Sequence, residues 1–139
     1  YKEVFMQKLV LAYNFSAERI SALKLACMLV KSPLKVVARE QLLQPLGYLA
    51  GVPGLEPVDE EYTGIEATEE MLILCGFGRP DLDRLLSAIR KGKLKNVALK
   101  AALTPTNALW SGVKLQGELA QEHAYMHGRK APKPKHDSL

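Results

Sequence analysis

Apolar residues follow two patterns along this chain: short unbroken runs, and residues spaced three and four positions apart. Unbroken runs predict buried strands, whereas the spaced residues predict amphipathic helices. The predicted strands are 8–13, 34–38, 71–75 and a fourth that begins at 96. The predicted helices and helical turns are 17–31, 44–51, 80–91 and about 110–126. Strand and helix therefore alternate through the whole chain, which is typical of α/β proteins.

The residues at the helix ends agree with this assignment. Ser16 has the short hydroxyl that caps a helix N-terminus, and Pro80 suits a first helical position. Gly92 is expected to end its helix in the left-handed conformation that glycine adopts without strain.

The two halves of the chain resemble each other when the first is shifted by 62 positions without a gap. The aligned pairs include Val10 with Leu72, Phe15 with Phe77, Cys27 with Ile89, Val37 with Leu99, and Tyr48 with Trp110. We interpret this match as an internal duplication of a β-α-β-α unit. The alternative is that any two such units share the same apolar periodicity.

The predicted fold is α/β, with two duplicated β-α-β-α units forming one sheet of about four strands covered by helices. Residues 1–128 would be a single domain whose repeats cover 8–51 and 70–127. An acidic connector at 52–69 would join the repeats. Residues 129–139 form a basic tail that lacks apolar anchors and is expected to be disordered.

Composition and charge refine this picture. A chain of 139 residues with 47% hydrophobic residues is globular, which excludes the disordered and fibrous classes. The net charge of +4 is unevenly spread, because residues 56–78 carry seven acids and no base, whereas residues 79–114 carry eight bases and two acids. We therefore expect the acidic connector to lie across the basic second unit.

Several classes of site are excluded by the residue types present. Cys27 and Cys75 lie in apolar runs, where we expect them to be buried, and two cysteines make no disulfide framework. No Cys or His cluster has zinc spacing. Glu118, Glu122 and His123 make no metal set alone, because successive helix residues diverge by about 100°. We predict no cofactor, no metal, no membrane span and a cytoplasmic location.

The most distinctive polar string lies where the fourth strand runs out into a turn. It contains Lys100, Thr104, Thr106, Asn107 and Trp110. Ligands of open α/β sheets bind beyond the carboxyl ends of the strands, where a lysine and helix N–H groups suit a small anion. In the alternative, structural interpretation the threonines and the asparagine cap a helix, Trp110 is core and Lys100 is solvated.

The same string carries a resemblance to a known family. Its pattern is Lys100-Ala101-x-x-Thr104-x-x-Asn107-x-x-Trp110, and Glu118-x-x-x-Glu122-His123 follows. Residues 71–126 thereby resemble a family of small bacterial proteins known as domain-of-unknown-function family 3783. The resemblance implies no activity. Gly112 departs from it, because helix formers are expected at the start of the closing helix.

The first unit lacks this polar set. The shift by 62 positions aligns Lys100, Thr104 and Asn107 with the residues Ala38, Leu42 and Pro45. A site built on the polar residues would therefore be present once in the chain.

The leading functional hypothesis is a non-enzymatic binding or regulatory module of the bacterial cytoplasm. It would contact a protein or small-molecule partner through Lys100, Thr104, Thr106, Asn107 and Trp110. The first alternative is a small-anion binder or enzyme that uses Lys100 and Asn107, although we assign no catalytic residue. The second is a weak nucleic-acid binder through the bases at 90–95 and the tail, without an aromatic-basic motif to support it. Edge pairing of two sheets would give a homo-oligomer.

Overall fold

The chain folds as an α/β structure in which each predicted strand and helix is present. The computed structural model describes residues 7–128, and the side chains of residues 7–122. The strands are β1 (Leu9–Tyr13), β2 (Leu34–Val37), β3 (Met71–Cys75) and β4 (Leu99–Ala102). The helices are α1 (Ala17–Leu29), α2 (Leu46–Ala50), α3 (Arg79–Lys91) and α4 (Gly112–Gly128). Two short 3-10 helices are η1 (Arg39–Leu43) and η2 (Asn107–Leu109).

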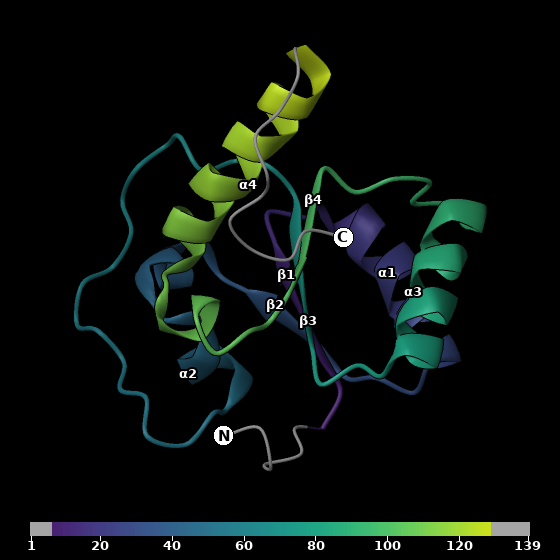
Figure 1. Cartoon of the computed structure of the whole chain (residues 1–139), viewed down its shortest axis with the longest axis horizontal. Coiled ribbons are helices and arrows are strands. Elements are labelled where there is room, and N and C mark those ends of the chain that lie inside the picture. The colour runs from purple at the N-terminus through teal and green to yellow at the C-terminus, as the bar shows by residue number, and fades with distance from the viewer. Residues whose placement is uncertain (1–6, 129–139) are drawn as a thin grey trace.

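The four strands form one mixed sheet in the order β2-β1-β3-β4. The outer pairs β1–β2 and β3–β4 are parallel, whereas the central strands β1 and β3 are antiparallel. Figure 1 shows α1 and α3 side by side on one face of the sheet, with α2 and α4 on the other. The predicted single sheet covered by helices is thereby confirmed. Because both faces are covered, the central strands are apolar along their whole length.

Successive side chains of the central strands enter two separate cores, because strand residues point alternately to opposite faces. Leu11, Tyr13 and Ile73 belong to the cluster beneath α2 and α4. Val10 and Leu72 belong to the cluster beneath α1 and α3. The sheet is therefore the middle layer of three.

The pairing of β1 with β3 is the pairing expected if an approximate two-fold axis between these strands related the two halves of the chain. Leu11 pairs with Ile73, which lies 62 positions later in the chain. The bounds of α1, Ala17–Leu29, likewise recur 62 positions later as those of α3, Arg79–Lys91. The predicted shift of 62 thus describes the first strand and helix of each unit. Duplication itself stays a prediction, and this geometry is what it would produce.

The ungapped alignment is wrong beyond α3. Val10 pairs with Leu34, whereas its counterpart Leu72 pairs with Lys100, so Leu34 corresponds to a residue 66 positions later. An isolated antiparallel bridge joins Pro45 to Ser111, again 66 positions apart. The link from α3 to β4 is longer than the link from α1 to β2, and periodicity alone does not detect such an insertion in a loop.

The helix ends differ from prediction at one position. The Ser16 side chain accepts a hydrogen bond from Arg19 N at 3.3 Å, as a cap should, and Pro80 lies in the first turn of α3. Gly92 is not left-handed, because its φ of −92° and ψ of −163° are extended. A Cβ at Gly92 would lie 2.8 Å from the Ala88 carbonyl oxygen. Close approach of the backbone, rather than a positive φ, therefore favours glycine there.

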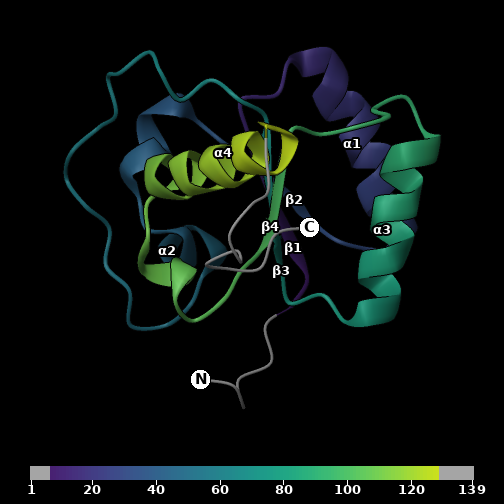
Figure 2. The same ribbon diagram turned by 45° about the horizontal axis from the view of Figure 1, so that its top comes forward.

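The acidic connector lies against the first unit, which corrects the expectation that it crosses the basic second one. Gln44 exchanges two hydrogen bonds with the backbone of Val58, and Tyr62 N donates to Glu40 O. Arg39 packs over the Tyr62 ring, 5.4 Å from its centroid. Figures 1 and 2 both place the connector on the α2–α4 side, across the sheet from α3. Hydrogen bonds to η1, not charge attraction to α3, therefore position this segment.

Both cysteines are buried, as predicted. Burial raises the pKa of the Cys27 thiol to about 11 and that of Cys75 to about 12, so both stay protonated at neutral pH. No helix among residues 7–128 is long and apolar enough to cross a membrane. The predicted basic tail at 129–139 lies outside the described residues.

Candidate functional site

Asn107, at the centre of the predicted polar site, is fully buried and bonded to its own turn. Its Oδ1 accepts from Thr104 N at 2.9 Å, and its Nδ2 donates to Ala102 O at 3.0 Å. Asn107 N in turn donates to Thr104 Oγ1 at 3.0 Å. This reciprocal pair resembles a capping box, which satisfies backbone groups at the start of a helix. The polar atoms of Thr104 and Asn107 are thus occupied by the chain itself.

The first unit contains a counterpart of this turn. Gln41 lies 66 positions before Asn107, and its Oε1 accepts from Ala38 N at 3.3 Å. The structural counterparts of Lys100, Thr104 and Asn107 are therefore Leu34, Ala38 and Gln41. The predicted counterparts Ala38, Leu42 and Pro45 came from the ungapped alignment, and all three assignments are wrong.

Lys100 and Trp110 lie on opposite sides of the sheet. Leu99 and Ala101, which flank Lys100 on β4, enter the cluster beneath α2 and α4, so alternation directs Lys100 to the α1–α3 face. Its Nζ donates to Val97 O at 3.0 Å, and partial burial lowers the pKa of Lys100. Trp110 packs against the α2–α4 cluster.

Thr106, the remaining member of the predicted set, is exposed at the tip of the turn. The fold therefore does not gather the five residues into one pocket. Binding at these residues stays a prediction, whereas the hydrogen bonds of Thr104 and Asn107 support the structural interpretation.

A groove of about 860 Å³ runs between α1 and α3, on the face away from the sheet. Three large apolar residues of α1 line it and remain exposed: Leu25 at 62%, Met28 at 69% and Leu29 at 67%. Small residues of both helices also line it, among them Ala22 and Ala88, which are more buried. Small side chains form the floor of the groove and the larger exposed ones form its rim.

This surface was not predicted, although the sequence carries a signal for it. One apolar stripe of α1, which includes Leu23 and Cys27, packs on the sheet. Leu25, Met28 and Leu29 form a second stripe with the same spacing of three and four. A helix that is apolar on two faces is expected to have a partner on each. The second stripe has no cover among the residues that the structure describes.

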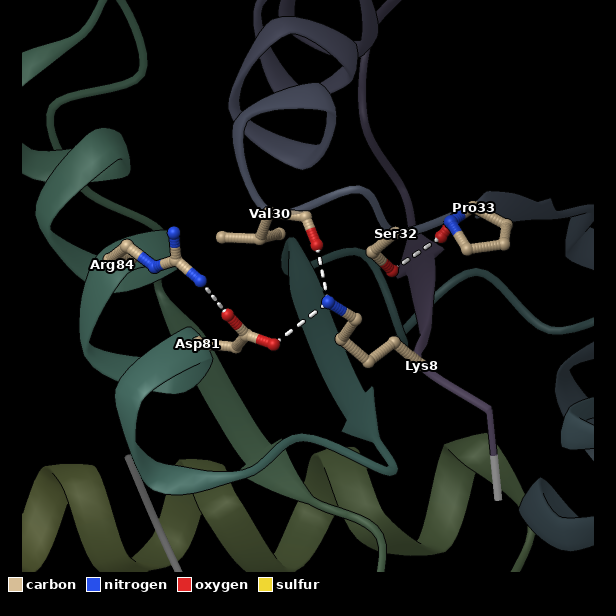
Figure 3. Close-up of polar contacts among 6 residues, drawn as sticks. All are labelled: Lys8, Val30, Ser32, Pro33, Asp81 and Arg84. Carbon is tan, nitrogen blue, oxygen red and sulfur yellow. Dashed lines mark hydrogen bonds and ion pairs between the residues drawn. The ribbon is translucent and has the colours of Figure 1, made fainter. Parts of the chain in front are cut away.

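A polar clasp fixes the spacing of the two helices at one end of the groove (Figure 3). Lys8 Nζ donates to Val30 O at 2.6 Å and to Asp81 Oδ2 at 2.8 Å. Arg84, which lines the groove, pairs with the same carboxylate. Lys8 thus lies at the C-terminus of α1 and Asp81 in the first turn of α3, so both charges complement the helix dipoles.

This clasp predicts a pH-dependent contribution to stability. Hydrogen bonds from Lys8 and then Arg84 lower the pKa of Asp81 in the folded chain. A carboxyl whose pKa is lowered by folding stabilises the fold above its unfolded pKa, about 4, and loses that contribution as the pH falls through the folded value.

We expect Asp81→Asn to unfold at a lower urea concentration than the parent at pH 7, and the two midpoints to converge in acid. Urea titrations from pH 7 to pH 2 measure this. Asp83→Asn is the control, because the ion pair that Asp83 forms with Arg79 is exposed. A difference between Asp81→Asn and parent that stays constant with pH would contradict the assignment.

Among the described side chains, no group of three or more His, Cys, Asp or Glu residues could hold a metal ion. The side chain of His123, weighed above with Glu118 and Glu122, lies outside that description.

Comparison with known families assigns the second unit. Residues 70–126 match the model of the family described as Domain of unknown function (DUF3783). The second unit is therefore similar to this family. The predicted resemblance over 71–126 is confirmed at the level of the family, while the individual motif positions stay predictions. Comparisons with curated proteins and with solved structures gave no match.

The DUF3783 match covers one wall of the groove and not the other. It runs from the residue before β3 into α4, so it includes α3. The α1 wall, with Leu25 and Met28, comes from the first unit, outside the match. The groove is therefore built by the pairing of the unit that matches DUF3783 with the preceding unit.

Proposed function

We propose that this chain is a non-enzymatic protein-binding module whose binding surface is the groove between α1 and α3. The observation that supports this is the exposure of Leu25, Met28 and Leu29 along one edge of the groove. Large contiguous apolar patches are uncommon on monomeric proteins and mark interaction sites, because burying apolar surface against a partner is favourable.

We also propose a bacterial cytoplasmic setting. The support is the family resemblance and the two free, buried cysteines, which suit a reducing compartment. A small-anion or enzymatic role at Lys100 and Asn107 is the alternative. It has weaker support, because Asn107 is fully buried and already bonded to its own turn.

Site-specific photo-cross-linking in cells tests the binding surface. A photoreactive residue at position 28 is expected to give adducts of discrete mass that the same residue at position 65 does not give. Ile65 is the matched position, because it is 82% exposed on the connector, away from the groove. Identical adducts at both positions, or none at position 28, would contradict the proposed function.

Two tryptophan variants show whether the adduct depends on the groove. Ser87 lines the groove, whereas Ser21 is exposed on α1 outside it. Ser87→Trp should fill the groove and reduce the adduct severalfold, while Ser21→Trp should leave it unchanged. An adduct that nuclease treatment removes would instead favour nucleic-acid binding through the bases at 90–95.

A further inference from the structure

We infer that the occupant of the groove is an acidic amphipathic α-helix of another protein. This inference rests on the proposed function and names the partner's chemistry. Its basis is the shape of the groove together with the charge of its lining, which are independent observations.

The shape of the groove suits a helix. Its two walls are residues 22–29 of α1 and residues 84–91 of α3, which gives a channel about 12 Å long. The small side chains Ala22, Ala26 and Ala88 lie between these walls and leave room for the side chains of a third helix. An amphipathic helix that lays its apolar face in such a channel is a recurrent mode of recognition.

The basic lining of the groove favours a partner with negative charge. Arg84, Lys91 and Lys93 line it, and no acidic residue does. Among the described ion pairs, Arg84 has an acidic partner and the two lysines have none. Acidic residues flanking the apolar face of a partner helix would meet these lysines.

Charge argues against one other occupant of the groove, and shape argues against a second. A second copy of the chain, docked by two-fold symmetry, would bring two copies of the same basic lining together and supply no acidic residue to it. An anionic bilayer would attract the lysines but is too flat to fill the floor formed by Ala22 and Ala88.

Two synthetic peptides of about 18 residues, long enough to form a helix, test the inference. Both carry leucines at spacings of three and four, flanked by glutamate in one peptide and by lysine in the other. Fluorescence anisotropy with the full chain should show the glutamate peptide binding roughly tenfold more tightly at low salt, with a smaller preference at high salt.

Charge reversal supplies the matched variants. Lys91→Glu combined with Lys93→Glu should reverse the preference between the peptides. Lys35→Glu combined with Lys114→Glu should preserve it, because these exposed lysines lie outside the groove, on β2 and α4. Equal binding of both peptides, or no binding of either at about 1 mM, would overturn the inference.

Further measurements distinguish an acidic helix from the other occupants, and failure of this inference from failure of the proposed function. Preferential binding to phosphatidylglycerol vesicles that the reversal of Lys91 and Lys93 abolishes, or a dimer that Leu25→Ser dissociates, would also overturn the acidic helix. If the adduct at position 28 persists while the glutamate peptide fails to bind, protein binding stands and the acidic helix does not. If that adduct is absent as well, both proposals fail.

Discussion

Asn107→Ala is expected to lower the free energy of unfolding by about 3 kcal/mol, because it leaves buried backbone groups without partners. The side chain is fully buried and bonds both Thr104 N and Ala102 O. Alanine would leave that N–H and that carbonyl unsatisfied and open a small void. Urea unfolding at neutral pH measures the change.

Thr106→Ala is the matched control in the same turn. Thr106 is exposed, so its truncation should change stability by less than about 0.5 kcal/mol. Near-parental stability of Asn107→Ala would contradict the capping role. It would also strengthen the alternative in which Asn107 and Lys100 serve a small ligand.

Gly112→Ala is expected to destabilise the fold by about 1–3 kcal/mol through overpacking. Gly112 is the first residue of α4, and a Cβ there would lie 2.7 Å from Cε2 of Tyr13. Tyr13 is 1% exposed at the centre of the sheet, so its ring has little freedom to move. Helix propensity alone predicts the opposite sign, a gain of up to about 1 kcal/mol. Thermal or urea unfolding decides between the two.

Gly117→Ala is the control for propensity in the same helix. A Cβ at Gly117 meets nothing within 4 Å, so this variant should be stabilised by up to about 1 kcal/mol. Equal effects of the two substitutions would show that contact with Tyr13 does not matter.

A double-mutant cycle isolates the contact between Gly112 and Tyr13. In a Tyr13→Leu background the shorter side chain should remove most of the penalty of Gly112→Ala. Tyr13→Phe alone should cost little, because Tyr13 Oη is buried without a hydrogen-bond partner among the described residues. An unchanged penalty in both backgrounds would contradict the packing explanation.

Gly112 also shows why its departure from the family pattern could not be explained from the sequence. It departs from the helix former expected at the start of the closing helix, and the reason lies about a hundred positions away in the chain. Tyr13, on β1 of the other unit, occupies the space that a side chain would need. A contact between distant segments leaves no periodic signal in either segment.

The strands and helices could be predicted from the sequence, because burial of one face or of both faces imposes a characteristic spacing of apolar residues. The apolar runs that form β1 and β3 are continuous because both faces of those strands are covered. Ser16 caps α1 through a hydrogen bond from Arg19 N, which lies three residues later in the chain. The polar turn at Thr104 and Asn107 was likewise found, with capping as one of its two interpretations.

Tertiary structure alone decided the rest, because it depends on which surfaces meet. Strand order, the four-residue change in register between the units, and the path of the acidic connector across η1 all arise from contacts far apart in sequence. The second apolar stripe of α1 was visible as spacing, but only the packed fold distinguishes a stripe that lies on the sheet from one that remains exposed beside α3. The sequence determines which residues are apolar enough to favour burial, and the packing of the fold determines which of them are buried.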